Sequence, residues 1–111
     1  MSPVELGARM AQWLASEYQA AVVEGHDQIL AYALYRSEPE FIYLRQLFVR
    51  PDQRRKGIGR ALLRWLWQHS WKDVPRVRVE VLTGNVAGQA FWRALGFSDY
   101  CLTLELPRPP A

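Results

Sequence analysis

The sequence has little of what metal, disulfide or membrane proteins need. It contains one cysteine, Cys101, and two histidines, His26 and His69, among 111 residues. One cysteine cannot form a disulfide within the chain, and this set is too small for a structural zinc site. No apolar run approaches the roughly 20 residues that span a bilayer, and residues 1–10 lack the pattern of a signal peptide. We therefore expect no metal, no membrane contact and a cytoplasmic location.

The composition is that of one globular domain. Half of the residues are apolar, 13% are aromatic and 23% are charged, which is ordinary for folded proteins and unlike disordered ones. A chain of 111 residues is long enough for one compact core and too short for two. We expect a single domain over residues 1–111, with a proline-rich tail at 107–111.

The spacing of apolar residues predicts a mixture of helices and strands. The opening SPVE, residues 2–5, has the form of a capping box and predicts a helix to about Ser16. Runs rich in Val, Ile, Tyr and Phe then predict an antiparallel meander that Pro51 ends. The expected strands cover residues 18–25, 28–36, 40–49, 76–82 and 100–106, and the expected helices cover residues 2–16, 58–70 and 87–95. This order predicts an α/β fold (α+β by some schemes) with a mixed, mostly antiparallel sheet and helices on both faces.

Positive charge is concentrated in one stretch. Residues 45–64 hold seven basic residues and one acid, Asp52, a net charge of +6. The other residues hold seven bases and ten acids, so the whole chain carries only +3. A local concentration of charge favours an anionic ligand bound at one place over a general nucleic-acid surface. We therefore expect no nucleic-acid partner.

Two glycines, Gly57 and Gly59, stand at the expected start of the helix from Ile58. The first N–H groups of a helix have no intrahelical partners, and the helix dipole adds about half a positive charge there. Glycines let an anion approach this backbone. The stretch is no P-loop, since Gly-Lys-Ser/Thr is missing, and no dinucleotide fingerprint, since the third glycine is missing. It predicts another kind of phosphate-binding corner, and the alternative is a solvated basic loop.

Two stretches together resemble the GNAT superfamily of N-acyltransferases. The first, LFVRPDQRRKGIGRALL at residues 47–63, is similar to the acetyl-coenzyme A (acetyl-CoA) loop of that family. Its pattern is Gln or Arg, two residues, Gly, one residue, then Gly or Ala, which Arg54, Gly57 and Gly59 match. The second, VEVLTGNVAGQAFWRALGF at residues 79–97, resembles the family's later conserved block.

The resemblance implies acetyl-CoA as cosubstrate. In the family the pantetheine arm lies along the strand before the loop, often beside a β-bulge that this sequence does not reveal. The pyrophosphate lies on the N–H groups at the helix start. Asn85 matches a residue that often contacts the pantetheine, and it can equally be only a helix cap. The cofactor-binding residues implied are Leu47, Phe48, Val49, Arg54, Arg55, Lys56, Gly57, Ile58, Gly59, Arg60, Asn85 and Trp92.

Glu80 is the candidate general base. An acceptor amine with a pKa of about 10.4 arrives protonated and must lose a proton before it attacks. Glu80 stands where the resemblance places the base of bacterial N-terminal protein acetyltransferases. The structural alternative is a strand glutamate paired with Arg78 or Arg45. Glu38 and Glu40 are weaker candidates.

Trp92 departs from the family pattern, which usually has a tyrosine there to protonate the departing thiolate. An indole has no proton to give at neutral pH, although a thiol with a pKa of about 8.5 can leave unassisted. We expect an acyltransferase that passes an acetyl group to a primary amine of a small molecule or peptide by direct attack on the thioester. The alternative is a non-catalytic module that binds acetyl-CoA and regulates a protein partner.

The family generally has a strand and a helix before its second helix, and this chain begins at what resembles that second helix. We therefore expect an N-terminally truncated member of the fold. The lost helix normally walls the acceptor site, so the acceptor cleft is either open or closed by a second copy. This reasoning predicts a homodimer.

Overall fold

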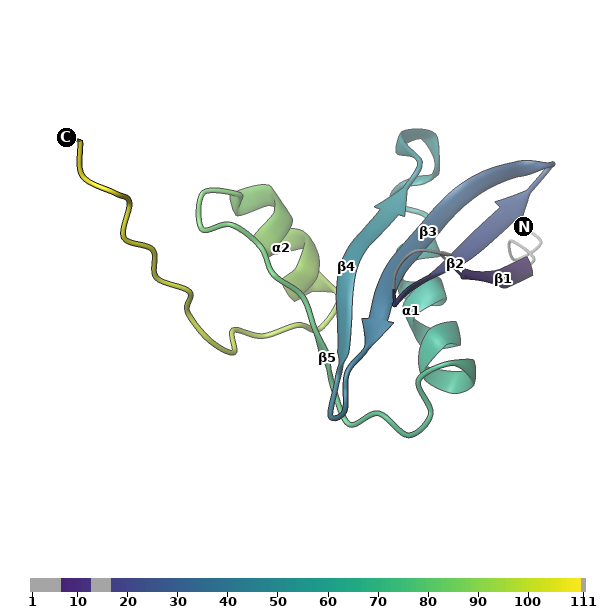
Figure 1. Ribbon diagram of the computed structural model, residues 1–111. Coiled ribbons are helices and arrows are strands. Elements are labelled where there is room, and N and C mark those ends of the chain that lie inside the picture. The colour runs from purple at the N-terminus through teal and green to yellow at the C-terminus, as the bar shows by residue number, and fades with distance from the viewer. Residues whose placement is uncertain (1–6, 13–16, 111) are drawn as a thin grey trace. The chain divides into compact units, whose positions relative to one another are not determined.

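The chain divides into two compact units, Met1–Glu80 and Val81–Ala111. The structure is a computed structural model that describes residues 7–12 and 17–110 (Figure 1). In the described residues, no helix is long and apolar enough to cross a membrane.

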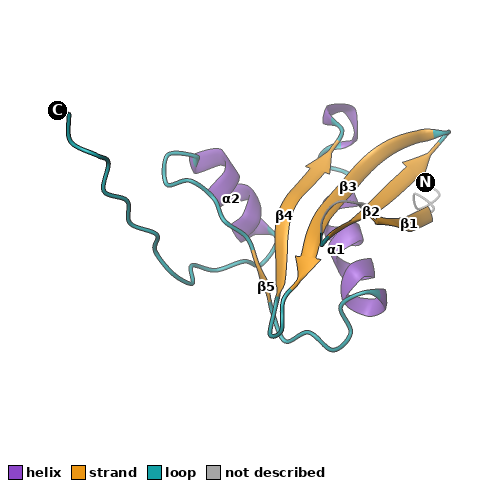
Figure 2. Ribbon diagram, viewed as in Figure 1, coloured by secondary structure: helices purple, strands orange, loops and turns teal. Residues whose placement is uncertain are grey.

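The first unit is built on a five-stranded mixed sheet in the order β1-β2-β3-β4-β5 (Figure 2). Its strands are β1 (Gly7–Gln12), β2 (Tyr18–Gly25), β3 (Gln28–Ser37), β4 (Ile42–Val49) and β5 (Val77–Arg78). Strands β1 to β4 are antiparallel to their neighbours, and β5 runs parallel to β4. The predicted mixed, mostly antiparallel sheet is confirmed, and β2 to β4 form the predicted meander.

Helix α1 (Ile58–His69) covers one face of this sheet, as its amphipathic pattern predicted. Trp71, just after the helix, is 1% exposed and meets the Tyr35 ring edge-on, with 5.2 Å between ring centroids. The buried sheet residues on the α1 side are Ala21, Val23, Ala31, Ala33, Tyr35, Ile42 and Leu44, and α1 contributes Ile58, Leu62, Leu63 and Leu66. In the described part of this unit, helices on both faces are not confirmed.

The opposite face of the sheet carries the alternate residues of the same strands. These side chains are only partly buried, and several are aromatic. Tyr18 pairs with Arg36 and Arg36 with Tyr43, while Tyr32 pairs with Phe48 and stacks on it at 5.3 Å. We call this surface the open face.

The N-terminal helix predicted over residues 2–16 is wrong over residues 7–12, which form β1. Residues 2–6 and 13–16 lie outside the described residues. Gly7 stands inside the predicted helix, where glycine costs about 1 kcal/mol relative to alanine. Pairing from Gly7 with Glu24 to Gln12 with Gln19 instead satisfies the backbone of β2, which would otherwise be a sheet edge.

Two later strand predictions also need correction. The strand predicted over residues 76–82 is limited to β5, which pairs only with Ile42 and Tyr43 of β4. Residues 100–106 have no regular structure, and their leucines, Leu102, Leu104 and Leu106, are more than 80% exposed. Alternating apolar residues suit a strand, but a strand also needs a hydrogen-bonded neighbour. None of the described segments pairs with residues 100–106.

The second unit contains helix α2 (Val86–Ala94), whose predicted start and stop are confirmed. Asn85 is the N-cap, and its Oδ1 accepts a hydrogen bond from the Gly88 N–H at 2.9 Å. Gly96, with φ at +105°, follows the end of the helix, as expected for a glycine that terminates one. The side chain of Gln89 donates to the carbonyls of Leu82 and Thr83 and closes the turn before the helix.

Candidate functional site

The basic loop between β4 and α1 leaves the start of the helix without a cap. The 3₁₀ turn η1 (Pro51–Gln53) redirects the chain after β4, and Arg55 and Gly57 adopt positive φ of 67° and 77°. Gly57 is the N-cap of α1, so no side chain caps the helix, and the first turn contains no acidic residue. The first N–H groups of α1 therefore have no side-chain cap at the positive end of the helix dipole, an arrangement that binds anions.

The single acid of this loop is neutralised within it. The guanidinium of Arg50 donates to the Asp52 carboxylate from Nε at 2.9 Å and from Nη2 at 2.5 Å, and it also contacts Gln28. The hydrogen bonds from Arg50 lower the pKa of the Asp52 carboxyl, so the pair stays ionised. The cations left around the helix start are all exposed: Arg54, Arg55, Lys56 and Arg60.

Arg54 also has a structural role. Its Nε donates to the carbonyl of Val49 at 3.0 Å, which ties the loop to the last residue of β4. Arginine has five N–H donors in a planar fork, so the rest of the Arg54 guanidinium can still meet an anion. Arg54, which matches the first position of the glycine pattern, thus holds the loop against β4 and adds to its positive charge.

Ile58 and Gly59 are the first two residues of α1, and both are buried. Ile58 is 4% exposed, so its side chain belongs to the core under α1. A Cβ added to Gly59 would lie 3.5 Å from Val49 Cγ2 and 3.7 Å from Leu47 Cδ2, which is ordinary contact. Packing within the protein therefore permits alanine at residue 59.

Strand β4 contains the bulge that the sequence analysis did not locate. Leu34 pairs with Gln46 and Tyr35 with Leu44, so Arg45 is an extra residue on β4. The bulge precedes Leu47, the first residue of the stretch predicted to lie along pantetheine. Its signal is present in the sequence, because the apolar positions that face α1 change phase after Leu44 and resume at Leu47.

Beyond the bulge, one edge of β4 is open. Strand β5 pairs with Ile42 and Tyr43 and then separates, so in the described residues β3 is the sole strand that pairs with residues 44–49 (Figure 1). An unpaired strand edge offers N–H and C=O groups to an extended ligand. The predicted pantetheine stretch, Leu47 to Val49, lies on this edge and leads directly into the basic loop.

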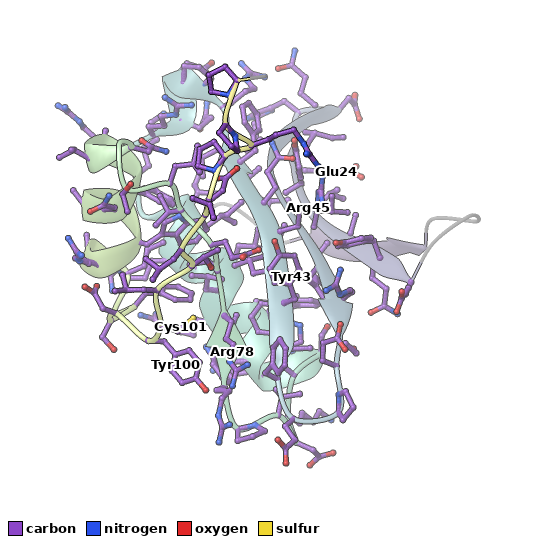
Figure 3. The ribbon with its side chains drawn as sticks, turned by 60° about the vertical axis from the view of Figure 1, so that its left-hand side comes forward. Glu24, Tyr43, Arg45, Arg78, Tyr100 and Cys101 are labelled. Atoms are coloured by element: carbon purple, nitrogen blue, oxygen red, sulfur yellow. The ribbon has the colours of Figure 1, made fainter. Side chains whose placement is uncertain are left out.

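Glu80 lies just after β5 and meets β4. Its Oε1 accepts a hydrogen bond from the Tyr43 hydroxyl at 2.7 Å. This hydrogen bond is the main cause that raises the pKa of Tyr43. Arg78 lies over the ring of Phe41 at 4.1 Å, and Arg45 lies over the ring of Tyr18 at 5.6 Å. Figure 3 labels both arginines together with Tyr43. In the described part of the chain, the alternative ion pair of Glu80 with either arginine is not formed.

The two weaker carboxylate candidates differ in their surroundings. Glu38 forms an ion pair with Arg36 at 2.5 Å. Glu40 is exposed in the turn before β4. Tyr43, the partner of Glu80, was not found by sequence reasoning, because 37 residues separate the two.

Asn85 and Trp92 belong to the second unit. The cap formed by Asn85 uses Oδ1, while its Nδ2 group donates to none of the described residues. Trp92 packs edge-on between Phe91 at 5.1 Å and Phe97 at 5.2 Å. The structure therefore places residues 47–60 and Glu80 within the first unit, where Glu80 contacts Tyr43 of the strand that leads into residues 47–60, and it gives Asn85 and Trp92 structural roles within the second.

Comparison with known proteins agrees with this geometry. The model of the acetyltransferase (GNAT) family matches residues 2–97. The UPF0157 protein YqkA of Bacillus subtilis (strain 168) is 28% identical over 83 residues, a match that covers 75% of this chain and 24% of that protein. The chain thus spans about a quarter of the length of this curated relative.

Solved structures show the same fold at low sequence identity. The aminoglycoside N-acetyltransferase AAC(6')-Iy in complex with CoA has a TM-score of 0.68 and 15% identity, covering 86% of this chain and 79% of that one. The BH1408 protein from Bacillus halodurans has a TM-score of 0.68 and 23% identity, covering 86% and 69%. The aminoglycoside 6'-N-acetyltransferase AAC(6')-IG from Acinetobacter haemolyticus has a TM-score of 0.69 and 17% identity, covering 86% and 72%.

Proposed function

Because the chain belongs to the acetyltransferase (GNAT) family, we propose that it is an acetyl-CoA-dependent N-acetyltransferase that acts on a primary amine. The observation that carries the proposal is the juxtaposition of the uncapped, basic start of α1 with the open edge of β4. The start of a helix can bind an anion such as the pyrophosphate of CoA. An open strand edge can hydrogen-bond an extended chain of amides such as the pantetheine arm of CoA. Structural relatives include an acetyltransferase in complex with CoA.

In this proposal the loop holds the pyrophosphate. The N–H groups at the start of α1 donate to it, and Arg54, Arg55, Lys56 and Arg60 supply counter-charge. Gly57 and Gly59 keep side chains away from the backbone that the phosphates approach. The backbone of Leu47, Phe48 and Val49 hydrogen-bonds the pantetheine arm as an added strand.

By the resemblance to the family, two residues of the second unit are further candidates for contact with the cofactor. Asn85 keeps its Oδ1 in the helix cap and has its Nδ2 group as a donor. Trp92 stands among other aromatic side chains. Both roles rest on the resemblance, and Asn85 has a test that leaves the helix intact.

Acetyl-CoA supplies a reactive thioester, and the chain supplies a base and a hydrogen-bond donor. Glu80 takes one proton from the acceptor ammonium, which frees the nitrogen lone pair to attack the acetyl carbon. The new C–N bond forms, the C–S bond breaks and sulfur leaves as the thiolate, while the nitrogen releases its second proton to water as the amide forms. A backbone N–H at the Arg45 bulge is the donor for the carbonyl oxygen as charge develops on it. Trp92 provides no proton to the thiolate.

The acceptor is a primary amine of a small molecule or a peptide. Two of the structural relatives are named for acetylation of aminoglycosides, and one is in complex with an acetylneamine-based bisubstrate analogue. Neamine is therefore a reasonable first acceptor. The open face near Glu80 carries aromatic rings and arginines, which can stack on a flat or sugar-like group beside the amine.

Trp92 is the observation that favours a second candidate function. With an indole where the family usually has a tyrosine, the domain could bind acetyl-CoA without transferring the acetyl group and regulate a protein partner. Binding is common to both candidates, so turnover is the property that separates them.

The test is a calorimetric titration with acetyl-CoA, followed by a screen for thiol release with neamine, spermidine, a lysine peptide and a free N-terminal peptide. Binding with release of thiol by one acceptor supports the transferase. Binding without release by any acceptor of a broad panel favours the regulatory module. Absence of acetyl-CoA binding would contradict both functions.

A further inference from the structure

Glu80 lies where the chain leaves the sheet. The backbone pairing of β5 ends at Arg78, and Glu80 is exposed two residues later. Such a side chain has many accessible rotamers and makes a poorly aimed base. In the described residues, the hydrogen bond from the Tyr43 hydroxyl, at 2.7 Å, is the contact that holds its carboxylate. Tyr43 comes from β4, the strand that leads into the basic loop.

The ring of Tyr43 is held in turn by its neighbour on β3. The guanidinium carbon of Arg36 lies 4.6 Å from the centre of that ring. Arg36 donates to Glu38 at 2.5 Å and to the Tyr18 hydroxyl at 2.8 Å, so three contacts fix its position. Tyr43 is therefore held by Arg36, and its hydroxyl in turn holds the Glu80 carboxylate.

We propose that Tyr43 is a positioning residue, whose hydroxyl orients the Glu80 carboxylate toward the acceptor amine. This inference rests on the proposed function, because it concerns how Glu80 acts as the base. Oε1 of Glu80 stays hydrogen-bonded to Tyr43, and Oε2 accepts the proton that leaves the acceptor nitrogen. Tyr43 keeps its own proton throughout and touches neither substrate.

The charged and titratable groups around the pair are compatible with this role. The hydrogen bond to Glu80 raises the pKa of Tyr43, so the phenol remains a donor above neutral pH. The groups that face the pair are Tyr18 from β2, Arg36 and Glu38 at the end of β3, Arg45 from β4 and Arg78 from β5.

The test compares Tyr43→Phe with Tyr32→Phe. The first keeps the ring under Arg36 and removes the hydroxyl that holds Glu80. The second removes a hydroxyl from the same open face, where Tyr32 stacks on Phe48 and its hydroxyl bonds to none of the described residues. Two readouts are followed in the full chain: the carbon-13 NMR chemical shift of the Glu80 carboxyl at one pH, assigned with Glu80→Gln, and kcat and KM with the best acceptor of the panel.

We expect Tyr43→Phe to change the carbon-13 chemical shift of the Glu80 carboxyl, because the carboxylate loses its hydrogen bond from Tyr43. It should also lower kcat by about threefold to tenfold, which corresponds to one hydrogen bond, while the KM for acetyl-CoA stays the same. Tyr32→Phe changes none of these. Equal carbon-13 shifts of the Glu80 carboxyl in the two variants would overturn the proposal, whether or not an acceptor is found.

The outcome for Glu80→Gln separates this proposal from the proposed function. If Glu80→Gln binds acetyl-CoA and turns over like the wild type, Glu80 is not the base and the role of Tyr43 falls with it, while the transferase assignment stands. If Glu80→Gln is impaired and Tyr43→Phe is not, only the role of Tyr43 is overturned. Loss of acetyl-CoA binding in the wild type would instead contradict the proposed function.

Discussion

Nε and Nη2 of the Arg50 guanidinium donate to the Asp52 carboxylate, at 2.9 Å and 2.5 Å. The pair removes the one negative charge from the loop that precedes α1. The other cations of this loop, Arg54, Arg55 and Lys56, are exposed. Arg50 and Asp52 also bracket Pro51, so the pair fixes the turn by which the chain leaves β4.

The first prediction concerns the pH dependence of this pair. Arg50 lowers the pKa of Asp52 below its ordinary value of 3.8, so the folded state binds the proton less tightly than the unfolded state. The pair therefore adds stability above that value, and the gain disappears as pH falls through the lower pKa of the folded state. We expect Asp52→Asn to lower Tm slightly at pH 7 and to match the wild type at about pH 2.

Thermal unfolding across this pH range measures the effect, with Asp73→Asn as the control. Asp73 is exposed and has no partner in the described residues. A deficit of Asp52→Asn that stays constant down to pH 2 would show that the ion pair is not its cause.

The second prediction separates the two glycines of the loop. Gly57 has φ at +77°, where any other residue is strained, and Gly59 is helical with room for a methyl group. Gly57→Ala should destabilise the fold by about 1–2 kcal/mol and weaken acetyl-CoA binding. Gly59→Ala should be as stable as the wild type, or more stable by up to about 1 kcal/mol. Urea unfolding would contradict this account if the two variants lost equal stability.

The third prediction separates the two roles of Asn85. Asn85→Ala removes the cap of α2 and should cost about 1 kcal/mol of stability. Asn85→Asp keeps an oxygen for the Gly88 N–H and places a negative charge at the helix start, so stability should be retained. Asn85→Asp lacks the Nδ2 donors, so calorimetry should show weaker acetyl-CoA binding. Wild-type affinity in Asn85→Asp would leave Asn85 as a cap alone.

The fourth prediction concerns the exposed charges of the loop. Arg55→Gln and Lys56→Gln should each weaken acetyl-CoA binding by about fivefold at low salt, which corresponds to about 1 kcal/mol for a surface charge pair. The difference should shrink at high salt because the charges are screened. Arg108→Gln removes one positive charge from the exposed tail and is the control. An equal loss in Arg108→Gln would mean that net charge, and not this loop, determines affinity.

The spacing of apolar residues along the chain correctly predicted the central strands and the helix that follows them. The alternation in β2 to β4 and the helical spacing from Ile58 are confirmed, because the apolar positions of these strands and of α1 are buried. The bulge at Arg45 was missed although the apolar phase changes between Leu44 and Leu47. The hydrogen bond from Tyr43 to Glu80 joins residues 37 apart, and no local pattern encodes it.

Two wrong predictions have the same physical origin. Residues 7–12 have an acceptable helical pattern, and residues 100–106 have a good strand pattern. Whether each forms depends on a partner elsewhere in the chain. Residues 7–12 pair with the edge of β2 and form a strand. Residues 100–106 pair with no described segment and have no regular structure. Sequence alone does not say which edges are available.

The central claim is that the start of α1 and the open edge of β4 form one acetyl-CoA site. The most direct measurement is a titration of the nitrogen-15-labelled chain with acetyl-CoA, followed by NMR. The account predicts that the backbone amide signals of Leu47, Phe48, Val49, Ile58 and Gly59 shift together and saturate at one affinity. Acetyl-pantetheine, which lacks the pyrophosphate, should shift them only at much higher concentration. Saturable shifts confined to other residues, or none at all, would contradict the account.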